Sequence, residues 1–232
     1  MITVYTVTYN EELLIQFMID HYRVRFPNCR IVVNHNKLST DNTLKIALSN
    51  DCEIRYDNNN KLRDEPLTMI KNNCWKDAKT DWVLVCDLDE LLDINEAELK
   101  QEERSGTTII RSEAYDMIDM EDKLDIAGMK YGARAEAGDK AYLFNKKYIS
   151  EINYSPGAHK CNPKGSIKYS NKAYKLYHYC YINYDVTVEK YRVCRARLSP
   201  EDIKNGYSFY EETPEEIRDL YTEARSKVVK VR

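Results

Sequence analysis

The most constraining feature of this sequence is an apolar run that leads directly into a group of acidic residues. Residues 82–86 read Trp-Val-Leu-Val-Cys, and Asp87, Asp89 and Glu90 follow them. A short apolar run between polar residues is typical of a strand buried on both faces, at the centre of a parallel sheet. Open α/β sheets bind ligands outside the carboxyl ends of their strands, so we expect the two aspartates to lie beside a ligand. The alternative is an acidic helix cap that follows a strand.

These carboxylates also indicate what kind of ligand to expect. Carboxylates crowded at a buried strand end repel one another unless a cation neutralises them. A site made only of oxygen atoms suits a hard divalent ion, Mg²⁺ or Mn²⁺.

The first 90 residues alternate strand and helix. Strands are predicted at 2–7, 30–34, 53–56 and 82–86, and helices at about 14–22, 43–50 and 64–79. We expect Asn10 to cap the first helix. The alternation predicts an α/β fold, with a mostly parallel, doubly wound sheet, right-handed crossovers and helices on both faces.

The second half has a less regular pattern. Further strands are predicted at 107–111, 141–144 and 174–179, and helices at 95–104, 185–197 and 213–229. We expect these strands to be antiparallel additions to the sheet, and the polar run 112–139 to form loops over a site. The length of 232 residues favours one domain, with a nucleotide-binding half at about 1–93 and an acceptor-side half at about 94–232.

Composition excludes several classes of protein. The net charge of −3 gives no electrostatic reason to expect a nucleic acid as partner. No apolar run approaches the ~18–20 residues that span a membrane, and the N-terminus lacks a signal-peptide pattern, so we expect a cytoplasmic protein without a transmembrane segment. The seven cysteines are scattered and form no C-x-x-C, which indicates reduced thiols.

The first half contains no glycine that could build a phosphate-binding loop. The first glycine is Gly106, and no G-x-G-x-x-G occurs anywhere. Backbone N–H groups at a tight turn therefore cannot hold the phosphates of a nucleotide. If the sheet binds a nucleotide, a metal ion must contact the phosphates, and cationic side chains must neutralise a diphosphate leaving group. The candidate cations are Lys61, Arg63, Lys140, Lys146, Lys160 and Arg195.

Two late histidines and a group of tyrosines allow more than one interpretation. His159 and His178 are each followed two residues later by a cysteine, but the spacing matches no common zinc module. We therefore prefer a single late histidine that completes the aspartate metal site. The tyrosines of 169–184 either line a sugar-binding face or pack between the sheet and the last helices.

Several ordered motifs resemble the GT-A glycosyltransferases of the family 2 type, especially the small enzymes of bacteria and large DNA viruses. The motifs are Val7–Glu12, Ser39–Thr43, Asp81–Glu90, Tyr115–Met117, Lys140–Asn145, Gly157–His159 and Lys175–Tyr179. The D-x-D alone is a weak signal, but the ordered set is specific and covers the chain to about Gly206.

The resemblance implies transfer of a sugar from a UDP- or GDP-sugar to a glycan or other hydroxyl acceptor, with Mn²⁺ or Mg²⁺ as cofactor. Inversion at the anomeric carbon is expected only as the habit of the family, and a viral protein would act in the host cytoplasm. The metal ligands implied are Asp87, Asp89 and His178. The nucleotide-sugar-binding residues expected are Thr6, Thr8, Asn10, Glu11, Asp41, Arg63, Asp87, Lys140 and His159.

A catalytic base is needed because the acceptor hydroxyl must lose its proton as it attacks. The sequence lacks the downstream Glu-Asp pair of better-known members, so Asp116 is the first candidate, followed by Glu113 and Asp119.

Three other functions stay open at this point. A sugar-phosphate nucleotidyltransferase would usually have a glycine-rich, basic loop where this chain has Thr8–Glu12. A phosphatase that uses the D-x-D would normally carry Thr or Val where Leu91 stands. A non-catalytic carbohydrate-binding relative is the third. The donor sugar, the acceptor and the oligomeric state are not determined by these residues.

Overall fold

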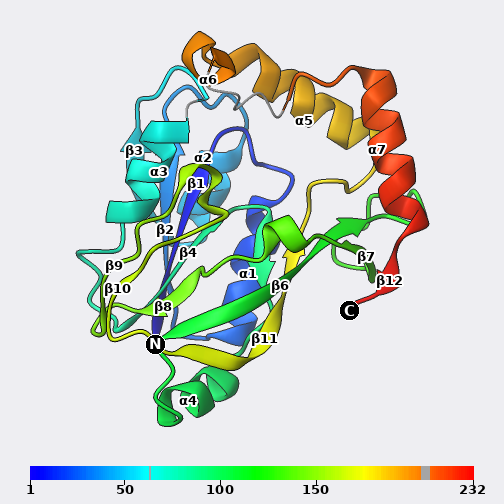
Figure 1. Cartoon of the computed structure of the whole chain (residues 1–232). Helices are drawn as coiled ribbons and strands as arrows, with labels where there is room; N and C mark the ends of the chain where they lie inside the picture. The colour runs from blue at the N-terminus through cyan, green and yellow to red at the C-terminus, as the bar shows by residue number, and fades with distance from the viewer. Residues whose placement is uncertain (63, 205–209) are drawn as a thin grey trace.

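A computed structural model of the chain describes residues 1–62, 64–204 and 210–232. One mixed sheet of ten strands runs through this part, in the order β12-β7-β6-β8-β4-β1-β2-β3, and β11 pairs with both β6 and β5 (Figure 1). The strands of this sheet are β1 (Ile2–Thr8), β2 (Arg30–Asn36), β3 (Glu53–Asp57), β4 (Trp82–Asp87), β5 (Glu90–Leu92), β6 (Ile109–Ile118), β7 (Tyr131–Arg134), β8 (Leu143–Asn145), β11 (Tyr169–His178) and β12 (Val229–Lys230). A separate pair is formed by β9 (Ile149–Glu151) and β10 (Lys164–Gly165).

Helices lie on both faces of the sheet and at its ends. They are α1 (Ile15–Arg25), α2 (Thr43–Ser49), α3 (Asp64–Asn73), α4 (Glu96–Arg104), α5 (Tyr184–Arg197), α6 (Pro200–Lys204) and α7 (Pro214–Ser226), with 3₁₀ turns η1 (Glu136–Gly138) and η2 (Pro156–Ala158). None of the described helices is long and apolar enough to cross a membrane.

The predicted parallel half of the sheet is confirmed. Strands β3, β2, β1 and β4 are all parallel, and β8 then pairs antiparallel with β4. Residues 82–86 of β4 are at most 4% exposed, which explains why this strand is apolar on both faces. The α/β class and the mostly parallel centre are therefore as predicted, and antiparallel strands are added to it. One of these predictions was only partly right: β11 is antiparallel to β5 but parallel to β6.

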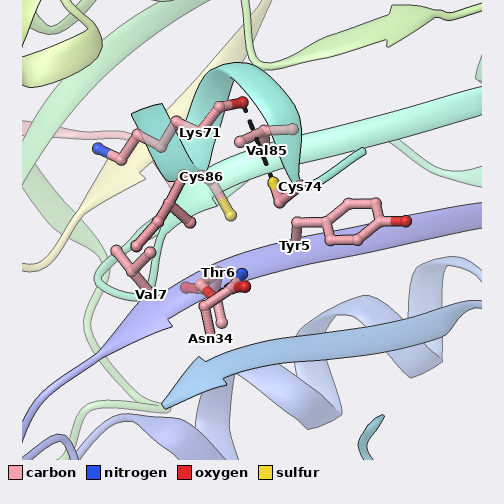
Figure 2. Close-up of a pocket in the computed structure, with 9 residues that line it drawn as sticks. Tyr5, Thr6, Val7, Asn34, Lys71, Cys74, Val85 and Cys86 are labelled. Carbon is pink, nitrogen blue, oxygen red and sulfur yellow. Dashed lines mark hydrogen bonds between the residues drawn. The ribbon is translucent and has the colours of Figure 1, made fainter. Parts of the chain in front are cut away.

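Helices α1 and α3 cover opposite faces of β4. On one face, the Tyr22 hydroxyl of α1 lies 3.8 Å from the Cys86 sulfur. On the other face, Lys71 of α3 and Cys74, which follows this helix, lie with Tyr5 of β1 around a space too small for a water molecule (Figure 2). Because both faces are closed, ligands can reach these strands only at their ends.

The C-terminal helices lie at one end of the sheet, and α4 lies at the other (Figure 1). The end covered by α5 is where the parallel strands finish. Helix α5 is held there because the Leu62 N–H donates to the Arg197 carbonyl over 2.7 Å, and the Arg197 guanidinium stacks 3.4 Å from the centre of the Tyr9 ring.

Three sequence predictions are corrected by the structure. The run 112–139 is not all loop: β6 continues to Ile118, and β7 follows. Residues 112–118 are polar and mixed in sequence, but pairing with β11 supplies the backbone hydrogen bonds that make them a strand. The helix predicted at 64–79 ends at Asn73. Asn10 does not cap α1: it has φ +54°, and α1 begins at Ile15 after Leu14.

His21 is a buried histidine of α1 with a structural contact. Its ring is buried, and Nε2–H donates to the Leu92 carbonyl over 2.9 Å. Burial lowers the pKa of His21 to about 4. The folded protein therefore keeps this ring neutral at pH values where the unfolded chain is protonated.

This predicts a loss of stability in acid. The free energy of unfolding should fall by about 2–3 kcal/mol on account of His21 as the pH is lowered from about 6.5 to about 4, because only the unfolded chain gains the proton in that window. His21→Gln keeps an N–H donor but does not titrate. Urea denaturation of both proteins across this range should show a weaker pH dependence for the variant, and equal dependence would contradict the assignment.

Candidate functional site

The acidic residues singled out in the sequence lie at the carboxyl end of β4, and strand register brings two later side chains to them. Asp87 ends β4, and Glu90 begins β5 three residues later. His178 is the antiparallel partner of Glu90 and the parallel partner of Asp116, so the last residue of β11 joins both strands. We call Asp87, Asp89 and Glu90 the acidic cluster.

Three lysines from three different elements neutralise the acidic cluster. Lys71 of α3 lies 2.7 Å from Asp87, and Lys140, which precedes β8, lies 2.7 Å from Glu90.

The third lysine, Lys190 of α5, forms an ion pair with Asp89. Glu90 also accepts a hydrogen bond from the Tyr142 hydroxyl. Each member of the cluster therefore has its own cationic partner.

The resulting pKa shifts show how strong these fields are. Burial opposes ionisation of Asp89, but Lys190 and then His178 hold the pKa of Asp89 well below its ordinary value. Burial likewise disfavours the ammonium of Lys71, but Asp87 raises its pKa. Nearby, burial and the charge of Asp89 raise the pKa of Glu11 to about 8. The lysines therefore keep Asp89 ionised although it is buried, whereas burial keeps the Glu11 carboxyl protonated at neutral pH.

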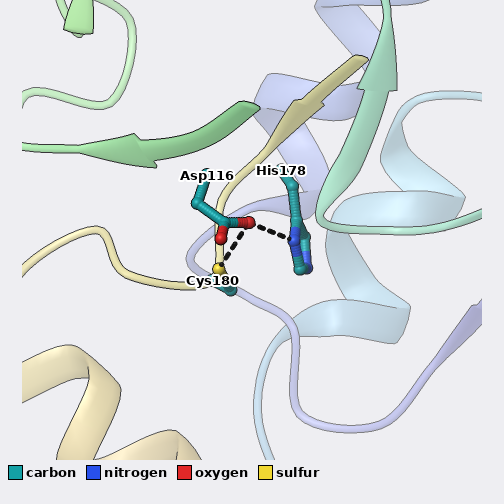
Figure 3. Close-up of side chains that lie close together, drawn as sticks. All are labelled: Asp116, His178 and Cys180. Atoms are coloured by element: carbon teal, nitrogen blue, oxygen red, sulfur yellow. Dashed lines mark hydrogen bonds and ion pairs between the residues drawn. The ribbon is translucent and has the colours of Figure 1, made fainter. Parts of the chain in front are cut away.

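His178 stands between the acidic cluster and Asp116. Its Nε2 lies 3.7 Å from Asp89 and 3.9 Å from Glu90, and its Nδ1 lies 2.8 Å from Asp116. The Cys180 thiol donates to the same Asp116 oxygen over 3.2 Å. Donor atoms of Asp116, His178 and Cys180 all lie within 4.8 Å of one another (Figure 3).

The two loops expected to hold the nucleoside are hydrogen-bonded to each other. Asn10 accepts from the Thr40 N–H over 2.8 Å, and its own N–H donates to Ser39 over 2.7 Å. Asp41 accepts from the Glu12 N–H over 2.8 Å, and the Glu11 N–H donates to Thr43 over 2.7 Å. The left-handed φ of Asn10 turns the chain so that these bonds can form.

Other predicted nucleotide-sugar residues have different surroundings. Thr6 is buried in β1, on the face of the sheet opposite α3 (Figure 2). Thr8 is buried as well, with its hydroxyl 3.1 Å from His35 Nδ1. Both side chains therefore lie inside the sheet's packing and not on an open surface. Arg63 lies outside the described residues.

A cavity of about 370 Å³ contains another subset of the predicted residues. It is lined by Arg111, Ser112, Glu113, Arg134, Asp139, Lys140, Ala141, His159, Cys161, Tyr169 and Ala173. The His159 Nδ1 is fixed by the Ala137 carbonyl at 2.9 Å. Lys140 connects this cavity to the acidic cluster, because it lines the cavity while its ammonium reaches Glu90.

The three candidate bases lie in three different places. Asp116 is bonded to His178, as described above. Glu113 points to the opposite face of β6, because side chains three positions apart on a strand alternate sides, and there it lines the cavity. Asp119 accepts the backbone N–H groups of Glu121 and Leu124 at 2.9 and 2.6 Å, which orders the loop after β6.

Sequence reasoning missed four residues of this site: Lys71, Lys190, Tyr142 and Cys180. Lys71 and Lys190 are helical lysines in polar sequence, and nothing local distinguishes them from surface lysines. Among the six cations named from the sequence, only Lys140 has a described contact with the acidic cluster. The one available signal was Cys180, which stands two residues after His178 and was considered only as a zinc ligand.

The buried pair of Lys140 and Glu90 leads to a stability prediction. Both side chains are only 3% exposed. Lys140→Met should lower the free energy of unfolding by about 3 kcal/mol, because it leaves the Glu90 charge buried without its cation. Adding Glu90→Gln removes that charge, so the double variant should recover part of the loss in urea denaturation. Equal losses for the single and double variants would contradict this account.

No family model matches the chain, and no curated protein matches it. Among solved structures, it is similar to a fragment of S. aureus TarS in complex with UDP-GlcNAc, at 16% identity and a TM-score of 0.46, covering 84% of this chain and 66% of that one.

A second similar structure is glucosyl-3-phosphoglycerate synthase from Mycobacterium tuberculosis in complex with Mn²⁺, UDP and phosphoglyceric acid. It has 15% identity and a TM-score of 0.43, covering 68% of this chain and 61% of that one. The chain thus spans less than two thirds of the length of these proteins.

Proposed function

We propose that this chain is a metal-dependent glycosyltransferase that moves a sugar from a nucleotide-diphosphate sugar to a hydroxyl acceptor. The main support is that His178 lies 3.7 Å from Asp89, two residues after Asp87 at the carboxyl end of β4. The joined loops of Asn10 and Asp41 follow the carboxyl ends of the neighbouring strands β1 and β2. The donor is proposed to be a UDP- or GDP-sugar and the acceptor a glycan, in the cytoplasm.

The side chains at this site fit a Mn²⁺ or Mg²⁺ ion. Asp89 and Glu90 each place an oxygen within 3.9 Å of His178 Nε2, and donor atoms that share one ion lie about 3–4 Å apart. We propose that Asp89 and His178 hold the ion together with Asp87, which ends β4, because Glu90 is already bonded to Lys140 and Tyr142. When bound, such an ion stabilises negative charge on a diphosphate leaving group.

The lysines of the cluster are proposed to work with the donor phosphates. Lys71 and Lys190 neutralise the two aspartates of the D-x-D. Their ammonium groups lie beside the proposed phosphate position, so they add positive charge where the leaving group develops negative charge. They therefore take the part that the sequence assigned to other cations.

The cavity beside Lys140 is proposed to bind the acceptor. It contains hydrogen-bond donors and acceptors of both charges, and its volume is within the ordinary range for small-ligand sites. Of the three candidate bases, Glu113 lines this cavity, with one carboxylate oxygen accepting from the Tyr115 hydroxyl. We propose that Glu113 removes the acceptor proton.

The first test concerns the metal and the nucleotide. Calorimetry with UDP and with GDP should show binding that requires Mn²⁺, and Asp89→Asn should weaken it at least tenfold, or by about 1.4 kcal/mol. Asp81→Asn is a matched control, since Asp81 is exposed at the opposite end of β4. Binding of neither nucleotide in the presence of Mn²⁺ would overturn the proposed function.

The second test concerns the base. A screen of nucleotide sugars should find Mn²⁺-dependent release of the nucleotide diphosphate, with water or an added saccharide as acceptor. Glu113→Gln should slow this release about 100-fold or more without changing nucleotide affinity, because only proton removal is lost. The exposed Glu136→Gln serves as control. An unchanged rate for Glu113→Gln would exclude Glu113 as the base.

A further inference from the structure

The two nitrogens of the His178 ring have different surroundings. Nδ1 lies 2.8 Å from Asp116 Oδ1, a hydrogen-bond distance, whereas Nε2 lies 3.7 and 3.9 Å from Asp89 and Glu90, which is too long for a direct bond. One nitrogen is therefore fixed by a carboxylate, and the other faces the acidic cluster across a short gap. Figure 3 shows the Asp116 side of this arrangement.

Asp116 is itself held in place. It is the register partner of His178 in the parallel β6–β11 pair, so the two side chains leave the sheet on the same face. Cys180 lies two residues after His178, just beyond the end of β11. Its thiol donates to the same Asp116 oxygen over 3.2 Å. The Asp116 and His178 side chains are only 20% and 26% exposed. Backbone register and a second hydrogen bond thus restrict where the Asp116 carboxylate can lie.

A carboxylate that accepts Nδ1–H decides which histidine tautomer is present. In the neutral ring the proton then stays on Nδ1, and the lone pair is on Nε2, directed away from the carboxylate. Metal-binding histidines commonly use this arrangement, in which an outer carboxylate orients the ring and increases the basicity of the ligating nitrogen.

We infer that Asp116 is a positioning residue for the metal site, and that it acts through His178. It holds the Nδ1–H tautomer so that the Nε2 lone pair faces Asp89, and Cys180 keeps the Asp116 carboxylate in that position. This inference rests on the proposed function, because it assumes a divalent ion between Asp89 and His178. It also gives Asp116 a role other than proton removal from the acceptor.

The test is metal affinity measured without any donor or acceptor. Titration with Mn²⁺, followed by the electron paramagnetic resonance of the free ion, should show Asp116→Asn binding about 10–100-fold more weakly than the wild type. The side-chain amide of this variant can donate to Nδ1. That bond favours the tautomer with its proton on Nε2, which leaves no lone pair there for a metal ion. Exposed Glu121→Gln, just after β6, should bind Mn²⁺ as the wild type does.

Variants of Cys180 provide a second measurement that does not depend on Asp116→Asn folding. Cys180→Ser retains a donor and should keep wild-type affinity, whereas Cys180→Ala should weaken Mn²⁺ binding several-fold. Nitrogen NMR of ¹⁵N-histidine protein with Mg²⁺ should place the His178 proton on Nδ1 in the wild type. In Asp116→Asn the proton should no longer be found only on Nδ1. The His178→Gln variant lacks the His178 resonance and so identifies it in the spectrum.

Three results would overturn the inference. In the first, Asp116→Asn keeps wild-type Mn²⁺ affinity and the Nδ1–H tautomer but loses sugar transfer, which would make Asp116 the base. In the second, Cd²⁺ produces a sulfur-to-metal charge-transfer band that Cys180→Ala removes, which would make Asp116, His178 and Cys180 direct ligands. In the third, the wild type binds no Mn²⁺, and the proposed function then fails as well. If only Asp89→Asn impairs metal-dependent nucleotide binding, the proposed function stands and this inference alone fails.

Discussion

The site depends on one electrostatic constraint: three carboxylates stand together at the end of a strand that is buried on both faces. Such a cluster is stable only if cations reach it, because the low-dielectric interior strengthens repulsion between like charges. The cations come from three separate elements, Lys71 on α3, Lys140 before β8 and Lys190 on α5. Helix α3 in the first half and helix α5 near the C-terminus therefore both contact carboxylates of the same cluster.

The same constraint accounts for the covering of the sheet's carboxyl end. Helix α5 supplies Lys190 to Asp89 and also packs on the rim through Arg197 and Tyr9. The joined loops of Asn10 and Asp41 form the neighbouring part of that rim without a single glycine. Side-chain oxygen atoms therefore satisfy the backbone N–H groups that a glycine-rich loop would direct to phosphate. In the proposed function, cations contact the phosphates instead.

Strand β6 separates two chemical environments. On one face, Asp116 contacts His178 and through it the acidic cluster. On the other face, Glu113 lines a cavity that contains both cationic and anionic residues. A metal-holding function and an acceptor-binding function can thus lie three residues apart on one strand, since alternate side chains of a strand serve opposite faces. Lys140 contacts both environments, which links the two proposed halves of the reaction.

The sequence by itself determined the parallel half of the sheet and the location of the acidic cluster. Hydrophobic runs and helix signals are local properties, and a buried parallel strand such as β4 has an unmistakable apolar run. Tertiary structure alone decided which lysines neutralise the cluster, that polar β6 is a strand, and that Asp116 meets His178 and not an open surface. These depend on pairing between segments far apart in the chain: Asp116 and His178 are 62 residues apart, and Lys190 and Asp89 are 101 apart. No local pattern records such contacts, because a lysine on a helix has the same sequence surroundings whether it faces solvent or a buried aspartate.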